Sequence, residues 1–203
     1  MMDNGFFHFK SKISLKQQQE ILEAVRTVVR EAPLFVPTMP QRGTLFGYRM
    51  TNCGQLGWVS NRSGYRYQVY HPATGEPFPT MPELIRELAI TLADEAGWSG
   101  FRPETCLINF YQKGESLGLH QDNSEQNLKA PIISISLGDA GIFLLGGEQR
   151  IDPTKKYILQ SGDCLVMSGK SRLYFHGFAG IVPNTNNLLK NGGRINLTIR
   201  QVN

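Results

Sequence analysis

The sequence lacks a long hydrophobic run. No apolar stretch among its 203 residues approaches the ~20 that a membrane-spanning helix requires. The first ten residues contain no basic segment followed by a hydrophobic stretch, so we expect no signal peptide. Internal repeats and low-complexity linkers are also missing. These features predict a protein without membrane association, and nothing in the chain points to an obligate protein partner.

Cysteine is scarce as well. The three cysteines, Cys53, Cys106 and Cys164, lie far apart in the chain. An odd number without C-x-x-C spacing indicates neither a disulfide framework nor a zinc knuckle. Such usage is typical of a reducing compartment, so we expect a cytoplasmic protein.

The share of charged residues is moderate. Charged residues make up 19% of the chain and apolar residues 40%, which are the proportions of an ordinary globular protein. A chain of 203 residues fits a single domain with a substantial core. The net charge of +4 has the sign that suits a polyanionic partner, although many basic proteins never touch nucleic acid.

Two segments show the periodicity of amphipathic helices. The first starts at Ser14, with Gln17 as its capping-box partner, and its apolar stripe is Ile21, Leu22, Val25, Val28 and Val29. The second starts near Thr80, with Glu83 in the same relation, and stops at Gly97; its stripe is Leu84, Ile85, Leu88 and Leu92. Both stripes predict core packing rather than cofactor binding.

From residue 105 onward the chain contains short apolar segments separated by Gly-rich or Asp/Pro-rich breaks. The expected strands are Ile132–Leu137, Gly141–Leu145, Lys156–Gln160, Cys164–Ser168, Leu173–Phe178 and Arg194–Gln201. Many short strands at this spacing predict a sandwich or a jelly roll. We therefore expect an α+β, mainly β fold with the two helices packed outside one sheet.

One histidine–carboxylate pair stands out, in His120-Gln121-Asp122, with a second histidine, His176, far downstream. On a β-strand, His120 and Asp122 project from the same face. Two histidines and one carboxylate can occupy one face of an octahedral metal, as in non-heme Fe(II) oxygenases. The alternative is that the pair arose by chance and that each histidine is a polar core residue.

The C-terminal segment alternates polar and apolar residues. Its polar face carries Arg194, Asn196, Thr198 and Arg200. The two arginines would stand roughly 20 Å apart on a strand, so they could serve different parts of one pocket. Asn109 and Tyr111 share a face of another expected strand and could help an arginine to hold a dicarboxylate. The alternative is an edge strand with solvated arginines.

Residues 45–71 interleave aromatic and basic side chains with glycine and asparagine. Trp58, Arg62, Tyr65 and Arg66 are among them. This mixture suits a surface that grips phosphates and stacks on bases. An ordinary β-meander with packed tyrosines and solvated arginines would show the same mixture.

Several stretches match a known family in order. They are Met50-Thr51-Asn52-Cys53-Gly54, Leu56-Gly57-Trp58, Cys106-Leu107-Ile108-Asn109 with Tyr111, Leu119-His120-Gln121-Asp122, Ala130-Pro131-Ile132 with Ser134, Ser136, Leu137 and Gly138, Gly162-Asp163, Ser171-Arg172-Leu173 with His176-Gly177, and Arg194 through Gln201. Together they resemble the AlkB family of Fe(II)/2-oxoglutarate-dependent nucleic-acid dealkylases, especially its bacterial repair enzymes. The matches run from about residue 46 to the end of the chain.

The resemblance implies one dioxygenase domain over residues 1–203. It has a double-stranded β-helix core at 105–203 and a nucleotide-recognition lid at about 45–71. It also implies that Fe(II) is bound by His120, Asp122 and His176. For 2-oxoglutarate, the resemblance implies that Arg200 contacts the keto-acid carboxylate and that Arg194 holds the distal carboxylate. The residues lining the pocket beside Arg194 would be Asn109, Tyr111 and Asn196.

For the substrate, the resemblance implies a flipped base that stacks on Trp58, with His120 on its other face. Tyr65 would contact a backbone phosphate, and Arg150 would make a further contact. Ser124 stands where the most similar bacterial repair enzymes carry an aspartate that approaches the base, with Glu125 beside it. A neutral side chain there predicts a weaker preference for cationic lesions, unless Glu125 takes over.

The implied reaction is oxidative dealkylation of 1-methyladenine and 3-methylcytosine in DNA, with etheno adducts as further candidates. It would consume O2 and 2-oxoglutarate, give succinate and CO2, and release formaldehyde from methyl lesions. Three alternatives remain open at this point: an RNA dealkylase of the same family, a small-molecule 2-oxoglutarate-dependent hydroxylase, and a metal-binding jelly roll without activity.

Overall fold

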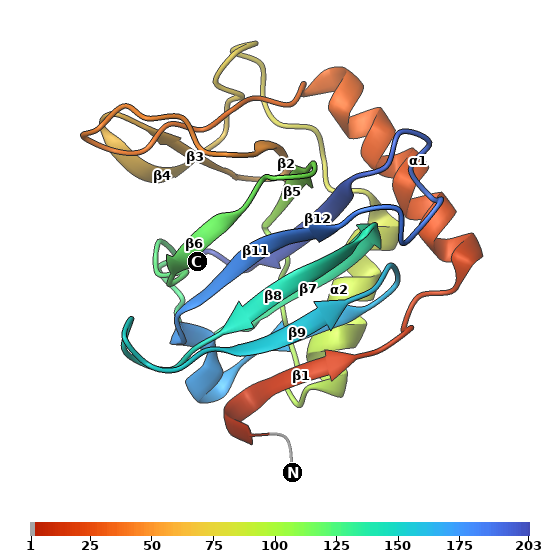
Figure 1. Cartoon of the computed structure of the whole chain (residues 1–203). Helices are drawn as coiled ribbons and strands as arrows, with labels where there is room; N and C mark the ends of the chain where they lie inside the picture. The colour runs from red at the N-terminus through yellow and green to blue at the C-terminus, as the bar shows by residue number, and fades with distance from the viewer. Residues whose placement is uncertain (1–2) are drawn as a thin grey trace.

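The computed structural model describes residues 3–203, in which two antiparallel sheets face each other (Figure 1). The larger sheet has the strand order β1 (Phe6–Phe9), β10 (Cys164–Met167), β7 (Ile132–Gly138), β12 (Arg194–Arg200), β5 (Thr105–Tyr111) and β2 (Arg49–Gly54). The smaller has the order β6 (Leu117–His120), β11 (His176–Val182), β8 (Ala140–Leu145) and β9 (Lys155–Leu159). This is the expected mainly β jelly roll.

A hairpin stands apart from both sheets. Its strands, β3 (Gly57–Asn61) and β4 (Gly64–Gln68), pair only with each other and project beyond the jelly roll (Figure 1). Within the segment 45–71, β2 is therefore a strand of the larger sheet, whereas β3 and β4 form a separate layer at its end.

The first helix, α1 (Leu15–Glu31), begins as expected. The Ser14 hydroxyl accepts from the Gln17 amide, and the Gln17 side chain accepts from the Ser14 amide, which completes the capping box. All but one residue of its predicted stripe are buried, and Val29 is partly buried against the same core.

The second helix, α2 (Glu83–Glu95), has its N-cap two residues later than expected. Pro82 is its N-cap, and no side chain caps it, so the predicted cap by Thr80 is wrong. The reason is that Pro82 disfavours the helical conformation at the residue before it. Leu84, expected in the stripe, is 38% exposed, and Ala89 is buried instead. Gly97, with φ +83°, ends the helix as predicted.

Both helices pack on the outer face of the larger sheet. A single hydrophobic cluster joins α1 and α2 to β5, β7 and β12, and Figure 1 shows both helices on that side. The inner face of the sheet is thereby left for the cavity between the two sheets. Among residues 3–203, no helix has both the length and the apolar content needed to cross a bilayer.

Three local expectations need correction. The segment predicted as a strand from Leu173 to Phe178 begins instead as a 3-10 turn over Gly169–Leu173, because Gly169 turns the chain at φ +52°. The strand starts only at His176. Asp122 lies beyond the end of β6 rather than on it. β12 is an interior strand between β7 and β5, so the alternative of a solvated edge strand is wrong.

Candidate active site

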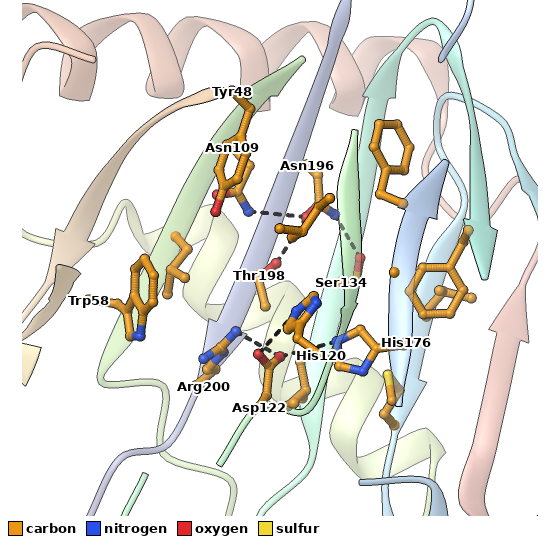
Figure 2. A pocket seen from close by; sticks show the side chains of 18 of the residues that line it. Tyr48, Trp58, Asn109, His120, Asp122, Ser134, His176, Asn196, Thr198 and Arg200 are labelled. Carbon is orange, nitrogen blue, oxygen red and sulfur yellow. Dashed lines mark hydrogen bonds and ion pairs between the residues drawn. The ribbon is translucent and has the colours of Figure 1, made fainter. Parts of the chain in front are cut away.

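Strand pairing brings the two histidines together. His120 ends β6 and is the register partner of His176, the first residue of β11, with ring centroids 4.4 Å apart. Asp122 follows β6. Its Oδ1 lies 3.6 Å from His120 Nε2, and its Oδ2 lies 3.5 Å from His176 Nε2. One donor atom from each residue lies within 4.8 Å of the others, so the three could hold one metal ion (Figure 2).

The two imidazoles are oriented for metal binding. His120 Nδ1 lies 3.0 Å from the Gly118 carbonyl, and His176 Nδ1 lies 2.9 Å from the Tyr174 carbonyl. Since a carbonyl only accepts, each Nδ1 donates to it, which turns each Nε2 toward the Asp122 carboxylate and the candidate metal position. Burial and the neighbouring His176 lower the pKa of His120 to about 4, which favours the neutral form that a metal requires.

A guanidinium completes the charge balance at this end of the cavity. Arg200 Nη2 lies 2.7 Å from Asp122 Oδ2. Burial alone would raise the pKa of Asp122, but the Arg200 charge and the two histidines hold it well below its usual range. Arg200 Nε is buried and has no hydrogen-bond partner among residues 3–203. One donor of this arginine therefore remains available for a ligand.

At the other end of β12, Arg194 lies in a different environment. It is 1% exposed, and its guanidinium donates to the Ser136 hydroxyl at 2.6 Å and to the carbonyls of Asp139 and Leu159. Within residues 3–203, no carboxylate forms an ion pair with it, and its Nε has no partner. A buried cation without a counterion fits the binding of an anionic ligand.

A glycine provides the space for this arginine. A Cβ at Gly141 would lie 2.7 Å from Arg194 Nε, so any larger residue would displace the guanidinium. Between the two arginines, Asn196 donates to Ser134 and accepts from Asn109 and Thr198. These bonds hold the Asn109 amide toward the cavity, where its Oδ1 is buried without a partner (Figure 2).

One cavity of about 200 Å³ connects these groups. One water molecule needs only about 10–15 Å³ of such cavity space, so the cavity has room for a small organic anion. The triad, both arginines, Asn109, Tyr111 and Asn196 all line it. Tyr111 packs between Tyr48 and Phe178, with ring centroids 4.9 and 4.4 Å away. The structure thus brings together every residue predicted for iron and cosubstrate.

The hairpin contributes aromatic rings to the mouth of this cavity. Trp58 on β3 lies across the pocket from the triad (Figure 2) and stacks on Tyr65 of β4 at 5.5 Å. Asn52 bonds to both backbone groups of Trp58 and so fixes its position. Tyr65 is 52% exposed. A half-exposed pair of parallel rings is a suitable platform for a planar ligand.

The last two predicted contacts differ from each other. Ser124 is exposed and lines the cavity. Arg150 is exposed and does not line it: its guanidinium lies 5.0 Å over the Phe175 ring and contacts the Leu119 carbonyl. Glu125 is buried beneath the cavity, bound to Arg172 and Arg200, so it does not replace the missing carboxylate at position 124.

Comparison with known proteins agrees with this geometry. Residues 5–200 match the model of the 2OG-Fe(II) oxygenase superfamily. The chain is 40% identical over 197 residues to the Caulobacter vibrioides alpha-ketoglutarate-dependent dioxygenase AlkB homolog, covering 97% of this chain and 87% of that one. It belongs to this superfamily, in its AlkB branch.

Two further similarities extend this result. The chain is 36% identical over 134 residues to human "Nucleic acid dioxygenase ALKBH1", covering 64% of this chain and 33% of the human one. The solved structure of OsALKBH1 superposes with a TM-score of 0.85 at 28% identity, covering 99% of this chain and 100% of that one. The expected family and the jelly-roll fold are therefore confirmed.

The protein is an AlkB-type dioxygenase, and its family implies the use of 2-oxoglutarate (alpha-ketoglutarate), Fe(II) and O2. The donor set fits Fe(II), since two imidazoles and one carboxylate leave other coordination positions open. The paired and unpaired arginines also fit a dicarboxylate with two distinct ends.

Several residues that shape the site escaped the sequence reasoning. Arg172 donates to Glu125 and to the Asp122 carbonyl, and Tyr67 of the hairpin donates to Glu125. Arg172 stands within a stretch that matched the AlkB family, so its motif was a usable signal. Tyr67 belongs to an aromatic-rich segment, which indicated a surface but not this inward contact.

Proposed function

We propose that this AlkB-type dioxygenase removes alkyl groups from bases in nucleic acid, with 1-methyladenine and 3-methylcytosine in DNA as its main substrates and etheno adducts as further ones. The observation that carries this proposal is the shared cavity. It joins the triad, a buried unpaired Arg194 and the stacked Trp58–Tyr65 pair. A small-molecule hydroxylase would have no use for such a platform at the mouth.

The protein's groups would divide the work as follows. His120, Asp122 and His176 would hold Fe(II), which supplies the activation of O2 when it is bound. Arg200 would bind the keto-acid carboxylate of 2-oxoglutarate through its Nε, the donor left without a partner among residues 3–203. Arg194 would neutralise the distal carboxylate, with Asn109 and Tyr111 beside it; Asn196 would orient Asn109.

The base must leave the duplex to reach this cavity, at a cost of a few kcal/mol. Methylation at the Watson–Crick edge lowers that cost, because the lesion has already lost its pairing. Trp58 would stack on the flipped base, and Tyr65 at the exposed rim would meet the phosphate backbone. Ser124 would face the base as a neutral group. Arg150, outside the cavity, would contact the nucleotide only at the rim.

The test is a coupled assay. The protein is incubated with Fe(II), 2-oxoglutarate and O2, together with single-stranded DNA or RNA that carries one methylated base. Formaldehyde, succinate and restored base are then measured, and we expect all three with DNA. The control is His176→Ala, which should keep the folded structure and lose turnover.

Four results would contradict the proposal. Succinate formation that ignores nucleic acid would indicate a small-molecule hydroxylase. Metal binding without any succinate would indicate a jelly roll that only binds. Restoration of methylated bases in RNA but not in DNA would indicate that RNA is the substrate. Full turnover by His176→Ala would remove the metal assignment itself.

A further inference from the structure

Glu125 is buried but does not belong to the cavity wall. Its side chain is 0% exposed, three residues after Asp122. The carboxylate accepts hydrogen bonds from Arg172 Nη2 at 3.0 Å, from Arg200 Nη1 at 2.7 Å and from the hydroxyl of Tyr67. Three donors from three separate segments converge on one carboxylate.

Two of these donors set the geometry of the triad segment. Arg172 Nη1 donates to the Asp122 carbonyl at 2.6 Å, and its Nε donates to the Ala130 carbonyl at 2.8 Å. Arg200 contacts the Asp122 carboxylate through Nη2. Glu125 therefore fixes both arginines that hold Asp122, one at its backbone and one at its side chain.

The third donor comes from the hairpin. Tyr67 lies on β4, its hydroxyl donates to Glu125, and its oxygen accepts from Arg200 Nη1 at 3.1 Å. Within the described residues, it is the only hairpin side chain that hydrogen-bonds to either group. Movement of the hairpin away from the jelly roll must therefore break this contact, and displacement of Arg200 must disturb it.

We propose that Glu125 is a positioning residue that couples the hairpin β3–β4 to the carboxylate-binding arginine through Tyr67 and Arg200. The inference rests on the proposed function, in which Arg200 binds 2-oxoglutarate and the hairpin binds the nucleotide. A ligand on Arg200 holds its guanidinium in place and thereby stabilises the docked hairpin. Bound 2-oxoglutarate thereby raises the affinity of the hairpin for a nucleotide. By thermodynamic linkage, a bound nucleotide raises the affinity for 2-oxoglutarate by the same factor.

Tyr67→Phe tests the coupling with the smallest change, because it removes one hydroxyl and keeps the ring. The matched control is Tyr70→Phe, in an exposed tyrosine of the same segment. Binding of a methylated single-stranded oligodeoxynucleotide is measured with Mn(II) in place of iron, with and without 2-oxoglutarate. We expect 2-oxoglutarate to tighten binding about fivefold or more in the wild type and in Tyr70→Phe. In Tyr67→Phe, the ratio of the oligonucleotide dissociation constants without and with 2-oxoglutarate should fall to about one.

A second readout needs no nucleic acid. Amide hydrogen exchange of residues 57–68 should slow when 2-oxoglutarate binds the wild-type protein, and this response should be lost in Tyr67→Phe. Glu125→Gln keeps the shape but removes the charge, so it should lose the same response and also weaken 2-oxoglutarate binding. If Glu125→Gln does not fold, the two tyrosine variants still decide the question.

The outcomes separate the two proposals. A wild-type ratio of one, or a Tyr67→Phe ratio equal to the wild type, overturns the coupling. If the wild type also restores methylated bases, the proposed function stands without it. A wild type that neither binds 2-oxoglutarate nor turns over overturns both.

Discussion

The two arginines of β12 share a strand and a face but differ in how their charge is met. Arg200 contacts two carboxylates, Asp122 and Glu125, whereas Arg194 has only neutral partners. Burial acts to lower the pKa of both. The carboxylates raise the pKa of Arg200 well above its usual value, but burial lowers that of Arg194 to about 10. One arginine is thus part of the protein's own charge network, and the other lacks a counterion until a ligand supplies one.

The largest expected effect comes from the paired arginine. Arg200→Ala leaves the buried Asp122 carboxylate without its arginine and Glu125 with Arg172 alone. We therefore expect it to lower the free energy of unfolding by about 3–5 kcal/mol and to abolish turnover. Chemical denaturation measures the change. The control is Arg26→Ala, which breaks an exposed ion pair with Glu23 and should cost less than about 0.5 kcal/mol. If Arg200→Ala and Arg26→Ala lost similar amounts of unfolding free energy, the buried ion pairs of Arg200 would matter no more than an exposed one.

The unpaired arginine should show the opposite profile. Arg194→Met removes an uncompensated buried charge but also leaves the Ser136 hydroxyl unpaired, so we expect stability to stay within about 1 kcal/mol. Binding of 2-oxoglutarate should weaken by about 2 kcal/mol or more, which is ~30-fold. Calorimetric titration in the presence of Mn(II) measures the affinity. A stability loss as large as that of Arg200→Ala would erase the distinction.

A smaller effect is expected at the hairpin, outside both arginine sites. Trp58→Ala should weaken binding of methylated single-stranded DNA by about 1–3 kcal/mol, the usual contribution of base stacking. Slow 2-oxoglutarate turnover without DNA should persist, because that chemistry needs only the triad and the arginines. Succinate assays with and without DNA separate the two activities. Equal loss of both would show that Trp58 supports the core rather than the substrate.

The smallest effect is expected at Ser124. Its exposure places a new carboxylate in near-aqueous surroundings, where attraction to a cationic base at 4 Å is about 1 kcal/mol. Ser124→Asp should therefore raise the ratio of 1-methyladenine to etheno repair about fivefold, and Ser124→Asn should not. Competition between two lesions in one reaction measures the ratio. An unchanged ratio would show that residue 124 does not discriminate between substrates.

Patterns close together in the sequence predicted most of this arrangement. Strict alternation over 194–200 placed both arginines on one face, and the H-x-D spacing selected two of the three triad residues. The capping pattern Thr80–Glu83 predicts the wrong start for α2, because Pro82 restricts the backbone of the residue before it. The role of Glu125 could not be predicted, since its partners Tyr67 and Arg200 lie 58 and 75 positions away. Nothing local marks such a contact.

The pairing of His120 with His176 has one more consequence. β6 has four residues and lies at the open edge of the smaller sheet, where strands are most exposed to fraying and to pairing with other chains. A metal bound by facing residues of β6 and β11 would link the two strands and so stabilise that edge. Metal loading would then govern the protein's solubility during storage and heating, separately from its role in the reaction.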